Sequence, residues 1–230
     1  MTRDAARPEP IALRVGERAV SGVLLRPPDA RWVLALAHGA GAGMRHPFLE
    51  DFAHALAARG VATLRYQFPY AEAGSRRPDP RPLLVATVRA AVAAAAARAP
   101  ELALLAGGKS MGGRMTSLAA AEAPLAGVRA IVFLGFPLHP AGRPGRERAA
   151  HLASVPLPML FLQGTRDALA DLSLLGPACE ALGARASLVV VDGADHGFRL
   201  RKADGGGARD VPGELAGAVA AFAARVAPAT

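Results

Sequence analysis

The sequence predicts an α/β protein built on a mainly parallel, twisted β-sheet with helices on both faces. Short aliphatic or β-branched runs alternate along the chain with longer alanine-rich stretches of helical spacing, as in folds where each helix crosses between parallel strands. Some runs are continuously apolar, such as residues 188–191, and this is typical of a strand covered on both faces. Proline opens several helical stretches and glycine lies near their ends, as at natural helix boundaries.

The predicted elements begin with an antiparallel hairpin. Residues 11–15 and 19–25 flank Gly16-Glu17 and form the edge of the sheet. Apolar runs then predict strands at 32–37, 62–66, 102–106, 130–134 and 159–163, and a last strand at 186–191. Helices are expected between them at 47–59, 82–98, 112–122, 172–182 and 212–226. The glycine-rich stretch 205–207 is expected to be a surface loop.

Length and composition predict one globular domain over residues 1–230. Of the 230 residues, 52% are hydrophobic and 20% are charged, which fits neither a disordered nor a fibrous chain. A chain of this length buries roughly 70 to 75% of the surface that its unfolded form exposes, so it needs no disulfide or structural metal. The single cysteine, Cys179, excludes an internal disulfide.

A cytoplasmic location is expected. Residues 1–10 contain four charged side chains and no apolar run, so they do not resemble a secretory signal. The apolar run at 90–97 is far shorter than the roughly 18 residues that a membrane span requires. No contact with a membrane is therefore predicted, and the sequence does not distinguish a monomer from a homodimer.

The net charge of +8 raises the question of a polyanionic partner. The basic residues are almost all arginines scattered among alanine, glycine and proline, and the chain has one Trp and two Tyr. Proteins that bind nucleic acids usually interleave aromatic side chains with clustered charge. No nucleic-acid partner is therefore expected, and the predicted partner is a small molecule.

The sequence around Ser110 has the pattern of a nucleophile elbow. Residues 108–112 read Gly-Lys-Ser-Met-Gly, a Gly-x-Ser-x-Gly motif between a predicted strand and a predicted helix. In such an elbow the serine occupies a strained turn, and the two glycines, here Gly108 and Gly112, are required because a Cβ would strike a neighbouring element. The following helix directs its positive end toward the charge that develops during acyl transfer.

The other parts of a serine hydrolase site follow in the order Ser, acid, His. His196 follows the last strand and is the predicted general base, and Asp167 follows the strand 159–163 and is the predicted acid. Asp192 and Asp195 are closer to His196 in sequence, but turn formation is the more natural role for them. The expected oxyanion hole combines the backbone N–H of Met111 with that of Ala40, in the glycine-rich loop after strand 32–37.

A phosphate-binding loop is a rival interpretation of the same residues. Residues 103–110 fit a relaxed P-loop pattern ending in Gly108-Lys109-Ser110, and the strand ending at Asp192 could supply the acidic residue of a nucleotide hydrolase. A phosphate cradle needs several flexible residues before the lysine. Here residues 104–106 are predicted strand, which leaves only Gly107-Gly108 as loop.

On these motifs the chain resembles the α/β-hydrolase superfamily. The more specific resemblance is to dienelactone-hydrolase-like domains such as those of testis-expressed protein 30 and of a subunit of the non-specific lethal chromatin complex. It rests on residues 37–40, 107–112, 136–139 and the His196 loop, and extends over the chain from about Trp32 onward. The resemblance implies the α/β-hydrolase fold and a Ser110–His196–Asp167 triad. Because one such domain belongs to a scaffold subunit, a catalytically silent binding domain is the main alternative.

The predicted reaction is hydrolysis of an ester, thioester or lactone through an acyl-enzyme on Ser110, with no cofactor. His139 lies beyond strand 130–134 and is a candidate substrate-binding residue, with a turn role as the alternative. No metal site is expected, because the histidines other than His196 show no paired spacing of the zinc-helix kind: His38, His46, His54, His139 and His151.

No large cap domain is expected, because only residues 135–158 separate two predicted strands where hydrolases commonly carry one. This room fits a loop and one short helix. The loops near the same strand ends contain many arginines, namely Arg76, Arg77, Arg81, Arg143, Arg146 and Arg148. If these side chains surround the site, they favour a substrate with an anionic group; otherwise they are solvated loop residues.

Overall fold

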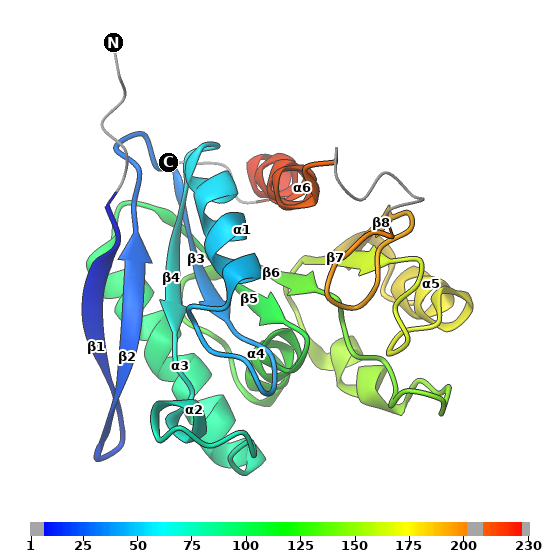
Figure 1. The fold of residues 1–230 in the computed structure, drawn as a ribbon, viewed down its shortest axis with the longest axis horizontal. Helices are drawn as coiled ribbons and strands as arrows, with labels where there is room; N and C mark the ends of the chain where they lie inside the picture. Colours follow the sequence, from blue (N-terminus) through cyan, green and yellow to red (C-terminus); the bar gives the residue numbers. More distant parts are fainter. Residues whose placement is uncertain (1–6, 202–208, 227–230) are drawn as a thin grey trace.

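A computed structural model describes residues 7–201 and 209–226 and shows an eight-stranded sheet in the order β1-β2-β4-β3-β5-β6-β7-β8 (Figure 1). The strands are β1 (Glu9–Val15), β2 (Arg18–Leu25), β3 (Trp32–Ala37), β4 (Val61–Tyr66), β5 (Ala103–Lys109), β6 (Val128–Leu134), β7 (Met159–Gly164) and β8 (Ala186–Val191). β1 pairs antiparallel with β2, and β2 pairs antiparallel with β4. The remaining pairs, from β4–β3 to β7–β8, are all parallel, so the predicted fold class is confirmed.

Helices cover both faces of the sheet. The α-helices are α1 (Pro47–Ala57), α2 (Pro69–Glu72), α3 (Arg81–Arg98), α4 (Met111–Glu122), α5 (Leu172–Glu180) and α6 (Val211–Val226). Figure 1 shows α1 and α6 together on one face, with α3 and α4 on the other. The central strands alternate between the two resulting cores: in β5, Leu104 and Ala106 face the α3 and α4 side, whereas Leu105 faces α1 and α6.

Two expectations from the sequence are wrong in detail. β5 continues through Lys109, so Gly107 and Gly108 pair with strands on both sides and are not a loop. A Cβ at Gly107 would lie 2.0 Å from the Val132 carbonyl oxygen, and this close approach explains a glycine within the strand. β8 is an edge strand, and Val189 and Val190 are exposed, whereas continuous apolar character predicted cover on both faces.

The connection from β6 to β7 contains only the 3-10 helix η1 (Glu147–Ser154), so the absence of a large cap is confirmed for this part of the chain. A second 3-10 helix, η2 (Gly183–Arg185), and the one-turn helix α2 have no counterpart among the predicted elements. Stretch 205–207 lies outside the described residues. Within residues 7–201 and 209–226, every helix is too short or too polar to cross a membrane.

Candidate active site

Three polar side chains meet at the carboxyl edge of the parallel strands. Ser110 follows β5, Asp167 follows β7, and His196 lies in the loop after β8. Because parallel strands end at the same edge of a sheet, loops far apart in sequence converge there. The structure therefore brings together the three residues that the sequence pattern selected.

The backbone at Ser110 makes a sharp turn between β5 and α4. Ser110 has φ 50° and ψ −116°, a left-handed conformation that non-glycine residues seldom adopt. The turn is held at both ends, because the Ser110 N–H donates to the Leu134 carbonyl at 3.0 Å and the Ser110 carbonyl accepts from Arg114 N–H at 3.1 Å. The side chain is thereby presented above the strand end.

The glycines on either side of Ser110 lie against backbone atoms. A Cβ at Gly108 would be 2.5 Å from the Ala37 carbonyl oxygen, and a Cβ at Gly112 would be 2.5 Å from the His38 carbonyl oxygen. Because backbone atoms cannot rotate away as a flexible side chain can, only glycine fits at these two positions.

A continuous chain of hydrogen bonds joins the three side chains. The Ser110 Oγ is 2.8 Å from His196 Nε2, and His196 Nδ1 is 2.7 Å from Asp167 Oδ2. The Asp167 side chain is fully buried, whereas that of His196 is 27% exposed. When Nδ1–H donates to the carboxylate, Nε2 is left as the acceptor for the serine proton.

Asp167 is held by two further donors. The Leu169 N–H donates to Oδ1 at 2.8 Å, and the side-chain amide of Gln163 donates to Oδ2. The other end of that amide, Oε1, accepts from the Phe136 N–H at 2.9 Å. Sequence reasoning missed Gln163; the available signal was a polar residue in a buried apolar strand, four positions before the acid.

The His196 loop is shaped by Asp195. Its Oδ1 accepts from the N–H groups of Gly197 and Arg199, at 2.8 and 2.9 Å. The Asp192 carboxylate accepts from the Thr165 hydroxyl at 3.3 Å. Both carboxylates therefore serve turns, and the His196 ring is hydrogen-bonded to Asp167 instead.

Backbone N–H groups adjoin Ser110 from two elements. Met111 begins α4, so its N–H has no partner within the helix. The loop after β3 passes alongside: a Cβ at Gly39 would be 3.6 Å from Ser110 Cβ, and Ala40 lines the same cavity as Ser110.

His38 anchors this loop, a role that the sequence did not reveal. Its Nδ1 is 2.8 Å from the Gly39 carbonyl oxygen, and its Nε2 accepts from the Phe68 N–H at 3.2 Å. Burial lowers the pKa of His38, which is consistent with a neutral ring that donates through one nitrogen and accepts through the other.

A cavity of about 710 Å³ opens beside Ser110 and His196. Its apolar wall comes from the start of α1 and from the His196 loop, where the Phe48 and Phe198 rings stack with centroids 5.5 Å apart. Of the arginines in the described residues, Arg199 alone lines this cavity. The cavity is not lined by any of the six loop arginines whose role the sequence left open, and one of them, Arg81, forms an ion pair with Glu122 at 3.0 Å.

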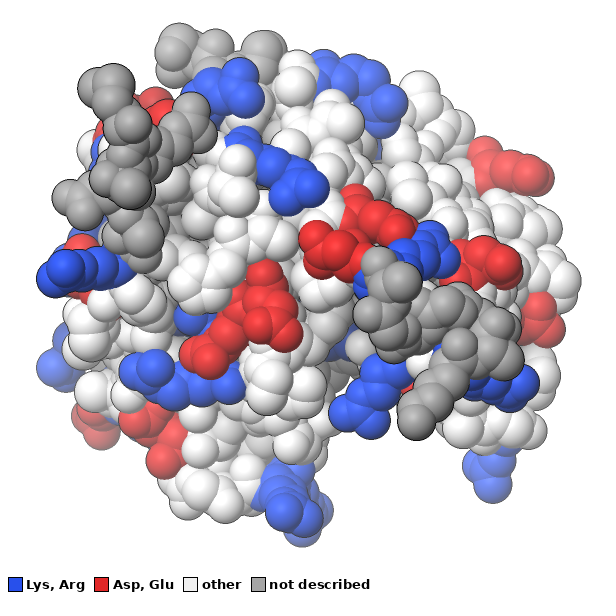
Figure 2. All heavy atoms as spheres, turned by 45° about the horizontal axis from the view of Figure 1, so that its top comes forward, with Lys and Arg blue, Asp and Glu red and all other residues white. Residues whose placement is uncertain are grey.

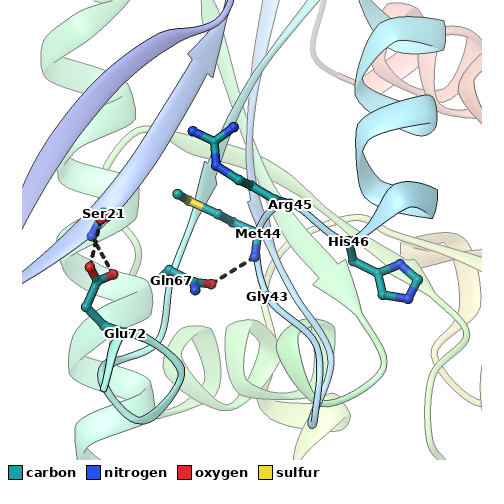
Figure 3. Close-up of a pocket in the computed structure, with 7 residues that line it drawn as sticks. All are labelled: Ser21, Gly43, Met44, Arg45, His46, Gln67 and Glu72. Atoms are coloured by element: carbon teal, nitrogen blue, oxygen red, sulfur yellow. Dashed lines mark hydrogen bonds between the residues drawn. The ribbon is translucent and has the colours of Figure 1, made fainter. Parts of the chain in front are cut away.

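A second cavity is lined by the loop after β3 together with residues of β2, α2 and the segment after β4 (Figure 3). In it Glu72 accepts from the N–H and the hydroxyl of Ser21, at 2.9 and 2.8 Å, and the Gln67 side chain accepts from the Met44 N–H at 2.8 Å. The Glu72–Ser21 bonds join α2 to β2, and the Gln67–Met44 bond holds the loop that carries Ala40.

His139 does not lie at the cavity beside Ser110. Its ring is buried, with Nδ1 2.9 Å from the Pro140 carbonyl oxygen and Nε2 accepting from the Asp171 N–H at 2.9 Å. Both ring nitrogens are thus engaged, and the Nε2 bond joins the loop after β6 to the loop after β7. This is the turn role that the sequence left open.

A second serine–histidine pair joins η1 to α4. Ser117 Oγ is 2.8 Å from His151 Nε2, and it also donates to the Arg114 carbonyl oxygen at 3.0 Å. Burial and the nearby Arg114 guanidinium lower the pKa of His151 to about 4. No carboxylate among the described residues is hydrogen-bonded to this ring, so the pair has the character of a packing contact.

Charges on the surface are mixed in sign. Figure 2 shows basic and acidic side chains interspersed over the face that it presents. Within the described residues, no group of three or more His, Cys, Asp or Glu side chains is placed to hold a metal ion.

Comparisons with known proteins agree with this architecture. A family model described as an alpha/beta hydrolase domain matches residues 30–224. No curated protein sequence matches the chain, so the narrower resemblance to testis-expressed protein 30 stays an expectation.

Solved structures are similar over nearly the whole chain. A dienelactone hydrolase from Anabaena variabilis is 25% identical, with 96% of this chain and 97% of that chain covered and a TM-score of 0.71. An α/β serine hydrolase without a lid from Xanthomonas campestris is 23% identical, with 97% of each chain covered and a TM-score of 0.72. The esterase domain of a Rhodothermus marinus protein is 18% identical, with 95% and 98% covered and a TM-score of 0.71. At 23% and 18% identity, the last two structures show a similarity of fold alone.

Proposed function

Because this chain belongs to the α/β-hydrolase family, we propose that it is a serine hydrolase acting on an ester, thioester or lactone of a small molecule. The observation that carries the proposal is the hydrogen-bond chain from Ser110 through His196 to the buried Asp167. The 25% identical neighbour is a dienelactone hydrolase, which supports including lactones among the candidate substrates.

In the proposed reaction, Ser110 Oγ attacks the carbonyl carbon while His196 Nε2 takes the hydroxyl proton. The N–H groups of Met111 and Ala40 stabilise the oxyanion. His196 then gives the proton to the leaving oxygen or sulfur, and the acyl-enzyme remains. Water then attacks the acyl carbon while His196 takes its proton, and that proton passes to Ser110 Oγ as the acid is released. The chemistry uses no cofactor.

Labelling with a fluorophosphonate tests this proposal, because the reagent forms a covalent bond with an activated serine. The wild type should be labelled at one site, and Ser110→Ala should lose both labelling and ester turnover. Ser117→Ala is the matched control, because Ser117 also contacts a histidine, yet this variant should label like the wild type.

Two outcomes would contradict the proposal. An unlabelled wild type without turnover would favour the silent binding domain, and equal labelling of Ser110→Ala would mean that another residue is the nucleophile. Circular dichroism of each variant distinguishes the loss of a nucleophile from the loss of the fold.

A further inference from the structure

Lys109 places a buried amine behind the His196–Asp167 pair. Lys109 lines the cavity beside Ser110, but its Nζ is sealed from solvent and has no hydrogen-bond partner in the described part of the chain. The point where Gly135 would carry a Cβ lies 3.1 Å from this Nζ, 3.4 Å from Asp167 Oδ2 and 3.4 Å from His196 Nδ1. The three polar atoms therefore surround the bare backbone of Gly135.

A buried cation without hydrogen bonds is unfavourable unless nearby charges compensate it. Burial lowers the pKa of Lys109 to about 8, against the attraction of the Asp167 and Asp195 carboxylates. The Phe198 ring centre is 5.5 Å from Nζ and adds a cation–π contact. Below about pH 8 the site thus holds one cation facing two carboxylates.

Asp195 shapes the His196 loop, and its carboxylate adds a second negative charge close to the Lys109 amine. Its Oδ1 accepts from two backbone N–H groups of that loop, so an acceptor is required there. Asp195 lines the same cavity as His196, so its carboxylate attracts positive charge within the site. The ammonium group of Lys109 opposes this effect.

We propose that Lys109 is a positioning residue that offsets the Asp195 carboxylate and so keeps His196 neutral, ready to take the Ser110 proton. This inference rests on the proposed hydrolase function. The other ionisable groups at the cavity are His46, Asp51 and Arg199. All three are exposed, so solvent and salt screen their charges more strongly than that of the buried amine.

The test compares the pH dependence of kcat/KM for p-nitrophenyl acetate in the wild type and in Lys109→Met. Methionine is chosen because it is neutral and of similar length. Removing the cation should move the midpoint of the acidic limb upward by about one pH unit, because protonated His196 then persists to higher pH. Above about pH 8 the curves should converge, since the wild-type amine is neutral there too.

A double variant separates charge balance from packing. Asp195→Asn keeps the acceptor oxygen and should lower the midpoint, and Lys109→Met combined with Asp195→Asn should restore the wild-type value. Arg199→Met is the matched control, because it removes an exposed cation at the same cavity and should leave the midpoint in place. If Lys109→Met fails to fold, Lys109→Gln serves for the same measurement.

An unchanged midpoint in the neutral Lys109 variants, or no restoration by Asp195→Asn, would overturn the inference. The wild-type measurements keep it separate from the proposed function. If the wild type neither turns over the ester nor reacts with the phosphonate, the hydrolase proposal fails, and an NMR titration of the His196 ring in the same variants still tests the charge effect.

Discussion

The side-chain amide of Gln163, near the end of β7, joins Asp167 in the loop after β7 to the backbone of Phe136 in the loop after β6. It donates to Asp167 Oδ2 and accepts from the Phe136 N–H at 2.9 Å. Because Gln163 belongs to the strand itself, it transmits the rigidity of the sheet to a carboxylate that lies in a loop. We therefore expect the orientation of Asp167, and through it that of His196, to depend on this amide.

Gln163→Met should therefore lower kcat/KM by about tenfold to a hundredfold, the range expected when a buried hydrogen bond to a charged group is lost. The variant should still be labelled by the phosphonate, only more slowly, because the serine and its base remain. Rates of labelling and ester hydrolysis measure the effect. A rate within twofold of the wild type, in a folded variant, would show that the amide is dispensable.

Asp167→Asn should cost about a thousandfold to ten-thousandfold in kcat, because the amide favours the wrong imidazole tautomer. Asp195→Asn should cost less than about tenfold at its optimal pH, since the asparagine oxygen can still accept the two loop N–H groups. Steady-state kinetics of the two variants on one ester compare them directly. The reverse ranking would assign the acid to Asp195.

Sequence reasoning located the elements and the three polar side chains for a physical reason. Strand and helix periodicity is a local property of the sequence. The motif around Ser110 is local too, because residues 108–112 directly follow a predicted strand and lead into a predicted helix. Gly107 and Gly108 are predicted to be loop because the apolar run ends at Ala106. Their place in β5 depends on close contact with neighbouring strands, which local sequence does not report.

The supporting residues of the site could not be found in this way. His38 and Gln163 act by bonding to backbone groups of other elements, the N–H of Phe68 and that of Phe136. His139 shows the opposite error, because a polar residue beyond a strand end points equally well to a pocket or to a turn until its partners are known. Such partners are separated by tens of residues, and only the folded topology brings them together.

Gly112→Ala should destabilise the protein by about 1 to 3 kcal/mol, because the new Cβ would lie 2.5 Å from the His38 carbonyl oxygen. It should also impair labelling of Ser110 by shifting the turn. Gly176→Ala is the matched control: Gly176 lies within α5 with nothing near its Cβ position, so alanine should stabilise by about 0.5 to 1 kcal/mol. Urea denaturation measures both, and equal effects would refute the packing argument.

The lining of the cavity beside Ser110 predicts a preference for neutral, apolar acyl groups. Phe48 and Phe198 form its aromatic wall, and the exposed Arg199 shares the cavity with the carboxylates of Asp51 and Asp195. The loop arginines that could have favoured an anionic substrate are absent from the lining, so their charges act only from a distance and are screened by salt.

A pair of short-chain esters, one neutral and one with a carboxylate remote from the scissile bond, tests this preference at low salt. The neutral ester should have the higher kcat/KM, and Phe48→Ala should lower it by about fivefold to thirtyfold, because burying an aromatic ring against the substrate contributes roughly 1 to 2 kcal/mol. Arg146→Ala is the control for the loop arginines and should change neither ester's constant. A higher constant for the anionic ester that is lost in Arg146→Ala would instead mean that the arginine loops reach the bound substrate, a closure that the cavity lining gives no reason to expect.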